Sequence, residues 1–399
     1  MSTVVMLVDW PDRYRFFSRW VSALEALGHR SVFITNKLSL YRRAGTDGIG
    51  AELIVKTPIR QEARLDGCRE IVSGMLSTRQ AQSLYWSSRA ALERLGEAAP
   101  IEAVVLWNGG GVAARALSDE CDARRVDMAF LEIANLPGKI VIDPAGVNAA
   151  SSVCTDIARL DRLDAQRESF ESWLESFVAV KSAGPVSLPQ AELMKRPDVW
   201  ATFVNNVGFH LRAVPRDDRT SLAVKAWRLV SRGLQTPPPR AEAEPGAYVL
   251  FPMQVSNDTQ VLLNSDMDLF GALEWAVRRA RGTGRRLLVK PHPAEPDPAV
   301  RRRLELGQGD DYSITGGDSF ELVRTAGEVV TINSTVGLEA RLVEVPVTFL
   351  GRTPYRLLDT RERVMKYVQS YLVNVDYFAD GDVSPEVASI LLERARGSW

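Results

Sequence analysis

Residues 329–350 read VVTINSTVGLEARLVEVPVTFL, and this stretch decides the fold. The β-branched run 329–332 predicts a strand, residues 335–343 predict a helix, and the run 347–350 predicts a second strand. A strand, a helix and a strand in close succession are typical of two parallel strands joined by a crossover helix. The stretch therefore predicts an α/β domain with a parallel sheet.

The same alternation extends from this stretch back to residue 247. Further strands are predicted at 247–251, 286–290 and 312–315, and further helices at 259–281, 297–306 and 319–326. The segment TPPPRAEAEPG (236–246) precedes them, and its four prolines exclude a helix or a central strand. We therefore expect a linker there and a doubly wound domain over residues 241–360.

The first part of the chain alternates in the same way, which predicts a second Rossmann-like domain over residues 1–240 with a helical insertion. Residues 361–399 look helical, and we expect them to pack back on the first domain. Two doubly wound α/β domains facing a cleft, closed by a helical tail, are the outline of a GT-B fold. The segments behind this prediction are strands at 3–8, 31–35, 102–107 and 127–132, and helices at 13–27, 81–95, 112–124 and 157–180.

Composition excludes several classes of protein. The 399 residues include 49 Lys and Arg and 50 Asp and Glu, so the net charge of −1 gives no positive field for nucleic acid. The three cysteines form no CxxC pair, which argues against a disulfide framework or a zinc knuckle. The N-terminus lacks the features of a signal peptide, and no run approaches the roughly 20 apolar residues of a membrane span. We expect a cytoplasmic protein that is at most peripheral on the inner membrane.

Ligands of open parallel sheets bind beyond the carboxyl ends of the strands, so the residues there are the candidates for function. Lys290, His292 and Pro293 follow the strand 286–290 in the motif KPHP. The two prolines hold the turn rigid, while lysine and imidazole can contact a phosphate. A tight turn with a capping histidine is the structural alternative.

A second candidate follows the strand 329–332. Asn333, Ser334 and Thr335 precede or begin a helix, whose free N–H groups attract an anion. Glu339 lies one turn into that helix and could accept a hydrogen bond from a ribose. Gln254, which follows the strand 247–251, is a further candidate for ligand contact. Ordinary helix capping and a polar loop are the structural alternatives.

Carboxylates in the first domain are candidates for glycosyl-transfer chemistry. Glu132 ends a predicted strand and Asp143 begins the turn DPAGVN, so either could act as nucleophile, acid or base. For Asp143 the structural alternative is an Asx turn before proline. The polar turn residues Asn108, Gly109 and Asn148 are candidates for contact with the acceptor sugar.

Histidine is scarce, with only three in the chain. His29 lies in a helix-to-strand turn and His210 in a loop-like segment, so His292 is the one in a position suited to chemistry. Two DxD spacings, 266–268 and 380–382, do not follow strands as a metal-binding DxD should. The sequence therefore predicts no metal site.

The strings FPMQVSNDTQ (251–260), LLVKPHPAEPD (287–297) and VVTINSTVGLEA (329–340) together resemble the capsule polysaccharide biosynthesis glycosyltransferases. These are retaining β-Kdo transferases that build the Kdo linker of group 2 capsules. The string LEIANLPGKIVIDPAGVNAASS (131–152) is similar to a segment of the same family, except that Ala134 stands where the family usually has glycine. The stretch 367–381 resembles the family's C-terminal signature more loosely.

The resemblance implies a GT-B fold and a CMP-β-Kdo donor as substrate, with no cofactor. Lys290 and His292 would hold the CMP phosphate together with Asn333, Ser334 and Thr335. A carboxylate of the first domain would act at the anomeric carbon with retention, and the choice between Glu132 and Asp143 stays open. The implied acceptor is a lipid or a Kdo-terminated glycolipid, handled beside the capsule machinery at the inner membrane.

Two alternatives have different consequences. A CDP-glycerol-type or other nucleotide-linked wall-polymer transferase would share the KPHP motif, although such enzymes usually carry Asp-x-Ser-Ser where this chain has residues 332–335. A non-catalytic component of a capsule assembly or export machine would bind partners without a nucleotide.

Overall fold

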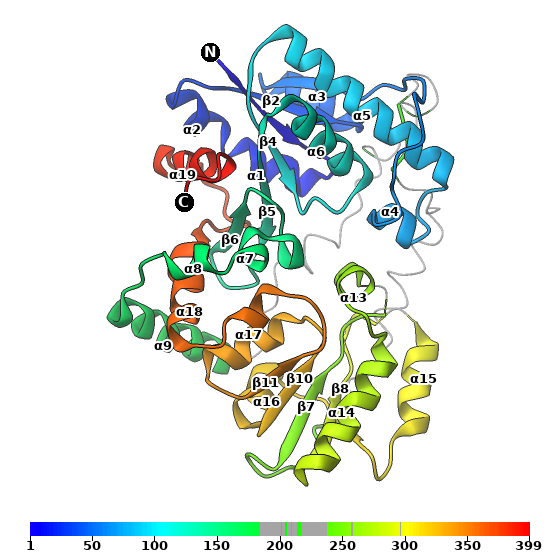
Figure 1. The fold of residues 1–399 in the computed structure, drawn as a ribbon, viewed down its shortest axis with the longest axis vertical. Helices are drawn as coiled ribbons and strands as arrows, with labels where there is room; N and C mark the ends of the chain where they lie inside the picture. Colours follow the sequence, from blue (N-terminus) through cyan, green and yellow to red (C-terminus); the bar gives the residue numbers. More distant parts are fainter. Residues whose placement is uncertain are drawn as a thin grey trace. The chain divides into compact units, whose positions relative to one another are not determined.

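A computed structural model describes residues 1–183, 201, 204–205, 209, 214–217, 238–256, 258–295 and 297–399. The chain divides into two compact units (Figure 1). Unit 1 contains residues 1–155, the described residues between 201 and 217, and residues 372–399. Unit 2 contains the described residues of 156–183 and 238–371. The predicted linker therefore lies partly outside the described residues, and His210 lies wholly outside them.

Unit 1 has a seven-stranded sheet in the order β12-β6-β5-β4-β1-β2-β3. Strands β1 to β5 are parallel, whereas β6 and β12 are added antiparallel at one edge. The strands are β1 (Thr3–Leu7), β2 (Arg30–Thr35), β3 (Gly50–Leu53), β4 (Ile101–Trp107), β5 (Asp127–Ile133), β6 (Lys139–Asp143) and β12 (Val373–Asn374). The helices are α1 (Pro11–Ser18), α2 (Val21–Ala26), α3 (Leu38–Thr46), α4 (Arg69–Val72), α5 (Thr78–Ala98), α6 (Val112–Arg124), η1 (Asn148–Ala150), α7 (Ser152–Thr155) and α19 (Pro385–Ala395).

Alternate residues of β1 point into the main core of unit 1. Val4 and Met6 are fully buried there beside Phe16 of α1 and Leu391 of α19. The C-terminal helix α19 lies next to α2, although the two are far apart in the sequence (Figure 1). The last 28 residues therefore form part of the core of unit 1.

Unit 2 has a five-stranded, wholly parallel sheet in the order β11-β10-β7-β8-β9. The strands are β7 (Tyr248–Pro252), β8 (Arg286–Lys290), β9 (Ser313–Ile314), β10 (Glu328–Thr331) and β11 (Val347–Phe349). The helices are α8 (Ala158–Asp161), α9 (Arg167–Ser182), α13 (Thr259–Asn264), α14 (Leu269–Thr283), α15 (Pro298–Gly307), α16 (Ser319–Thr325), α17 (Thr335–Leu342), η2 (Pro354–Leu357), α18 (Arg361–Lys366) and the π-helical turn η3 (Tyr367–Tyr371).

The alternation of β7 divides unit 2 into two cores. Val249 and Phe251 pack against α14 on one face, while Tyr248 and Leu250 pack against α16 and α17 on the other. Helices on both faces make the sheet doubly wound. Both sheets place their first strand between the second and the fourth, which is the Rossmann order. The predicted α/β class, with two doubly wound sheets of GT-B type and a helical C-terminal region, is confirmed.

Some elements differ from those predicted. The helix expected at 259–281 is split into α13 and α14, because Asp268 caps a new helix by accepting from the Gly271 N–H. Helices α8 and α9 belong to unit 2, whereas the predicted first domain runs to residue 240. Aromatic packing explains the difference, since Phe177 of α9 packs edge-on against Phe320 of α16.

Candidate functional site

The predicted nucleotide-binding residues gather at one edge of the sheet in unit 2. Strand β7 has β8 on one side and β10 on the other. The strands after β7 are therefore added first on one side of it and then on the other, so the strand order reverses at this point. The register pairs Pro252 with Lys290 and Leu250 with Val329. Continued past the strand ends, this register places the loops that carry His292, Gln254 and Asn333 beside one another.

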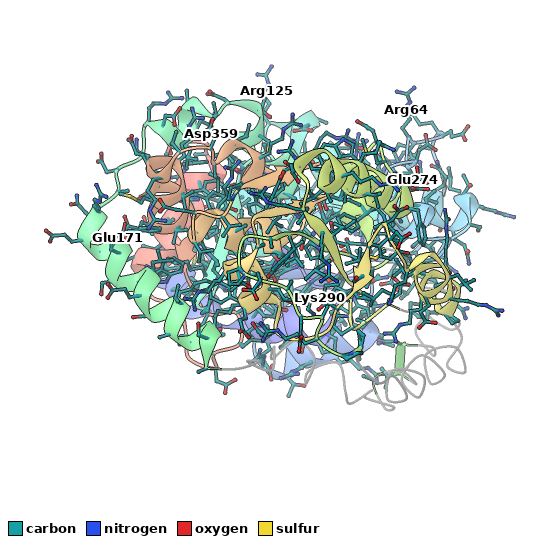
Figure 2. The ribbon with its side chains drawn as sticks, turned by 90° about the horizontal axis from the view of Figure 1, so that it is seen from below. Arg64, Arg125, Glu171, Glu274, Lys290 and Asp359 are labelled. Carbon is teal, nitrogen blue, oxygen red and sulfur yellow. The ribbon has the colours of Figure 1, made fainter. Side chains whose placement is uncertain are left out.

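The KPHP turn presents two possible donors. Lys290 ends β8 (Figure 2), and its ammonium has no hydrogen-bond or ion-pair partner among the described residues. Burial lowers the pKa of Lys290, an effect that the Asp318 carboxylate opposes. The Nδ1 of His292 accepts from the Ala294 N–H at 3.1 Å, which assigns the ring proton of the neutral imidazole to Nε2. In this tautomer the partly exposed His292 carries its N–H on Nε2, while Pro293 is exposed.

Gln254 and Asn333 bind each other. The Gln254 amide donates to Asn333 Oδ1 at 2.9 Å and accepts from the Asn333 N–H at 3.2 Å. Both side chains are buried, and Asn333 also donates to the carbonyl of Gln260. These two predicted ligand residues thus brace the loops after β7 and β10, because their polar groups are largely satisfied within the protein.

Helix α17 begins directly after this brace. Ser334 is its N-cap and accepts from the Val336 N–H at 3.2 Å, and both Ser334 and Thr335 are partly exposed. One turn on, the buried Glu339 forms an ion pair with Lys181 of α9 at 2.7 Å through Oε1. The helix start can therefore meet an anion, and Oε2 of Glu339 remains as an acceptor.

Glu295 holds the KPHP turn against the loop after β7, a role that the sequence analysis missed. Its carboxylate accepts from the Ser256 N–H and the Ser256 hydroxyl, each at 2.7 Å, and from the Asp297 N–H at 2.9 Å. The side chain is 4% exposed, so these bonds are shielded from water. The loops after β8, β7 and β10 are thereby joined into one hydrogen-bonded frame.

In unit 1, Glu132 lies where the sequence predicts it, near the end of β5. Asn108, just past the neighbouring strand β4, donates from its amide to Glu132 Oε2, and the Ile133 N–H donates to Oε1 at 3.0 Å. Burial raises the pKa of Glu132, although these donors and the guanidiniums of Arg13 and Arg69 oppose the shift. Glu132 as a residue is partly exposed, and the burial of its carboxyl group favours the protonated form more than water does.

The turn after β4 has the backbone that its sequence suggests. Asn108 and Gly109 have φ values of 64° and 78°, and a Cβ at Gly109 would lie 2.8 Å from the Phe130 ring. Glycine is therefore required at this position. The tight turn brings the Asn108 amide back to Glu132, so two of the predicted residues are adjacent.

Asp143 is the last residue of β6, and Asn148 lies on the loop that follows. The Asp143 side chain is fully buried and accepts from the N–H groups of Ala145, Gly146 and Ser152 and from the Ser152 hydroxyl. Asn148 begins η1 with a φ of 54° and is partly exposed. The contacts of Asp143 match the structural alternative of an Asx turn.

Replacing Asp143 by Asn should lower the free energy of unfolding by about 1.5–3 kcal/mol, because buried hydrogen bonds to a charged acceptor are lost. Urea denaturation measures the change. Asp66→Asn, at an exposed position of unit 1, is the matched control and should have little effect. Equal stability of the two variants would contradict a structural role for the Asp143 carboxylate.

In the part of the chain that the structure describes, no group of three or more His, Cys, Asp and Glu side chains is arranged to hold a metal ion. None of the described helices combines the length and apolarity needed to cross a membrane.

The family model described as "Capsule polysaccharide biosynthesis protein" matches residues 103–359, which is more than half of the chain. The chain belongs to this family. The matched range contains all the candidate residues from Asn108 to Glu339, and it confirms the family resemblance based on the short motifs. The candidate residues of both units therefore belong to a protein of the capsule polysaccharide biosynthesis family.

Individual relatives are more distant. Protein FixF of Sinorhizobium fredii is 27% identical over 264 residues, which are 64% of this chain and 50% of FixF, so the chain spans about half the length of that relative. A solved structure titled Thermosulfurimonas dismutans KpsC, beta Kdo 2,7 transferase, is 16% identical, with 99% of this chain and all of that chain covered and a TM-score of 0.42. A UDP-N-acetylglucosamine 2-epimerase from Listeria monocytogenes is 13% identical, with 99% and 97% covered and a TM-score of 0.31.

Proposed function

We propose that the protein is a glycosyltransferase that moves Kdo from CMP-β-Kdo to a lipid or Kdo-terminated acceptor, with retention, in capsule polysaccharide synthesis. The observation that carries this proposal is the frame in unit 2. It places a lysine, a histidine donor and a helix start beyond the carboxyl ends of β8 and β10, on either side of β7. Membership of the capsule polysaccharide family supports the same process.

In this proposal, unit 2 binds the CMP portion of the donor. Lys290 supplies a positive charge to the phosphate, and His292 Nε2–H and the first turn of α17 supply hydrogen bonds. Fixed donors of this kind stabilise the negative charge that builds up on the leaving phosphate without reorganisation of solvent. Ser334 and Thr335 contact the same phosphate, and Glu339 Oε2 accepts from a ribose hydroxyl.

Unit 1 supplies the carboxylate that acts on the sugar, and we assign this role to Glu132. A Glu132 oxygen attacks the anomeric carbon of Kdo as the bond to the CMP phosphate breaks, and CMP leaves with the bonding electrons. An acceptor hydroxyl then displaces Glu132 from the same carbon, and the departing Glu132 carboxylate takes up the hydroxyl proton. Two inversions give net retention. Asp143 is less suited because its oxygens are occupied by buried donors.

The pH dependence follows from the pKa of Glu132. A nucleophile must be ionised, and burial moves its pKa above the ordinary value of 4.5. The kcat/KM for the donor should therefore fall on the acid side at a pH above 4.5, which is higher than for an ordinary glutamate. Initial rates between pH 4 and pH 8 measure this limb. A rate that stays constant down to pH 4.5 would argue against ionised Glu132 as the attacking group.

A donor panel tests the reaction itself. Release of CMP from CMP-β-Kdo in the presence of a Kdo-terminated glycolipid, with formation of a β-linked product, is the expected result. The rate should not change when EDTA is added, since we propose no metal. We also propose that the protein acts as a peripheral enzyme at the cytoplasmic face of the inner membrane. Transfer from CDP-glycerol or a UDP-sugar, with none from CMP-β-Kdo, would overturn the proposal.

A further inference from the structure

The turn after β4 has the sequence NGGG (108–111) and carries the side chain of Asn108 to Glu132 on the neighbouring strand β5. The Asn108 N–H donates to the Leu131 carbonyl at 2.8 Å, so the main chain of the turn is fastened to the same strand. A Cβ at Gly110 would lie 3.0 Å from Asn108 Oδ1. Glycine at this position therefore lets the turn close around the asparagine side chain.

The backbone of Asn108 is left-handed, with a φ of 64°. Among residues that have a side chain, asparagine is one of those that adopt this conformation most readily. The turn itself therefore sets the direction of the Asn108 side chain, and that direction leads to Glu132. A residue held in a sparsely populated backbone conformation beside a candidate site points to a functional role.

The two carboxylate oxygens of Glu132 have one donor each among the described residues. Oε1 accepts from the N–H of the next residue, Ile133, at 3.0 Å, and Oε2 accepts from the Asn108 amide. Asn108 is therefore the one side chain in the described part of the chain that hydrogen-bonds this carboxylate. Because a carboxylate oxygen has two lone pairs, each oxygen of Glu132 keeps one for chemistry.

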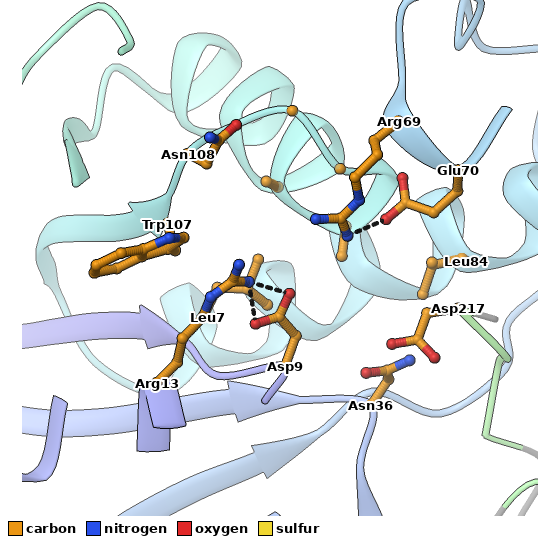
Figure 3. A pocket seen from close by; sticks show the side chains of 14 residues that line it. Leu7, Asp9, Arg13, Asn36, Arg69, Glu70, Leu84, Trp107, Asn108 and Asp217 are labelled. Carbon is orange, nitrogen blue, oxygen red and sulfur yellow. Dashed lines mark hydrogen bonds and ion pairs between the residues drawn. The ribbon is translucent and has the colours of Figure 1, made fainter. Parts of the chain in front are cut away.

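Charged groups from other elements also act on Glu132. Burial raises its pKa, and the Asn108 amide opposes this shift most, followed by the Ile133 N–H and then by the guanidiniums of Arg13 and Arg69. Both guanidiniums already pair with carboxylates of their own (Figure 3). The amide is therefore the strongest of the groups that favour the ionised form of Glu132.

Two further neighbours of Glu132 carry no positive charge. Val141 lies opposite it on β6 and is apolar. Tyr377 packs on Trp107 at the end of β4, and its pKa is raised to about 12, chiefly by burial and in part by the charge of Glu132. The phenol is therefore neutral near pH 7. Neither residue can replace the amide as a support for the charge.

The pocket beside this turn is too small for a sugar (Figure 3). Asn108 lines it, and its volume of about 30 Å³ is room for a water or two. Asn108 is therefore placed to act within the protein, on Glu132, and not on a ligand in that pocket.

We propose that Asn108 is a positioning residue for the transfer reaction, whose amide orients Oε2 of Glu132 and holds the carboxylate in its ionised form. The inference rests on the proposed function, in which Glu132 attacks the anomeric carbon. A donor that the fold has already fixed needs no rearrangement at the moment of reaction. This role differs from the contact with the acceptor sugar that the sequence suggests for Asn108.

The pH dependence of kcat/KM for CMP-β-Kdo tests this role. Asn108→Gly removes the amide and accommodates the positive φ, whereas Asn108→Ala removes it and keeps a Cβ. Because the amide binds the ionised form of Glu132, its loss favours the protonated form and raises the pKa. The acid limb should therefore move up by about one to two pH units in both variants, the equivalent of one hydrogen bond to a charged group. The affinity for CMP should not change, because the proposed CMP site is in unit 2.

Asn135→Gly and Asn135→Ala are the matched controls. Asn135 is an exposed asparagine of the same unit with a φ of 55°, and its side chain has no hydrogen-bond partner among the described residues. These variants make the same backbone changes without removing a contact to Glu132. Their acid limb should stay at the wild-type pH.

A wild-type acid limb in the Asn108 variants, even with a lower plateau rate, would overturn the inference, and so would an equal shift in the Asn135 variants. Carbon-13 NMR titration of the Glu132 carboxyl group, assigned with Glu132→Gln, measures the same pKa without donor. If that pKa shifts in the Asn108 variants but the wild-type protein does not use CMP-β-Kdo, the proposed function fails and the role of Asn108 in ionising Glu132 stands. If turnover requires Glu132 but neither the limb nor this pKa shifts, the proposed function stands and the inference fails.

Discussion

Replacing Glu132 by Gln is expected to lower turnover of CMP-β-Kdo by about 10²- to 10⁴-fold, the usual range for removal of a group that acts on the reacting atoms. The amide keeps the size of the side chain but cannot attack the anomeric carbon. Affinity for CMP should not change, because the proposed CMP site is in unit 2 and Glu132 is in unit 1. Steady-state CMP release and a CMP titration, made on the same preparation, separate the two effects.

Glu62→Gln is the matched control for this experiment, since Glu62 is an exposed glutamate of the same unit. It should retain full turnover. Asp143→Asn gives a second comparison: any loss of rate there should follow its loss of stability. A Glu132→Gln variant with more than a tenth of the normal rate would be incompatible with a nucleophilic role for this carboxylate.

Replacing His292 by Ala is expected to weaken CMP binding by about 10- to 100-fold, the equivalent of one hydrogen bond to a charged group. The imidazole Nδ1 is occupied by the Ala294 N–H, so the loss would come from Nε2–H. His292→Gln, which retains an N–H donor, should recover part of the affinity. Calorimetric titration with CMP, compared with cytidine, shows whether the lost interaction is with the phosphate.

His29→Ala is the control for a general effect of losing an imidazole. His29 lies in unit 1, where its Nδ1 is 2.8 Å from the Ser2 hydroxyl, and its replacement should leave CMP affinity unchanged. Lys290→Met should weaken the binding of CMP but not that of cytidine, because the ammonium offers a charge to the phosphate. Normal CMP affinity in both His292→Ala and Lys290→Met would rule out the KPHP turn as a phosphate site.

Much of the fold could be predicted because the strands and helices alternate with clear periodicity. The stretch 329–350 forms β10, α17 and β11 as its pattern indicates. The edge strand β12 has only two residues, too few to show a period, and it pairs with β6, more than 200 residues away in the sequence. The break between α13 and α14 depends on the cap formed by Asp268, a residue that a long apolar pattern hides.

For the candidate residues, the sequence indicates where a residue lies in the fold better than what its side chain contacts. Position at a strand end identified Lys290, His292 and Glu132, since parallel strands present their carboxyl ends at one edge of a sheet. The same rule cannot say whether a polar side chain meets a ligand or another side chain, and Gln254 and Asn333 meet each other. Glu295 was missed because its partner Ser256 lies on a different loop, whose position only the folded chain defines.

Mass spectrometry of the intact protein after exposure to CMP-β-Kdo without acceptor tests the central claim most directly. A double displacement predicts one Kdo residue bound covalently to the protein, and peptide mapping should place it on Glu132. The adduct should disappear when acceptor is added and should be absent from Glu132→Gln. An adduct on Asp143, or turnover of CMP-β-Kdo by the wild-type protein with no adduct under rapid quenching, would contradict the mechanism.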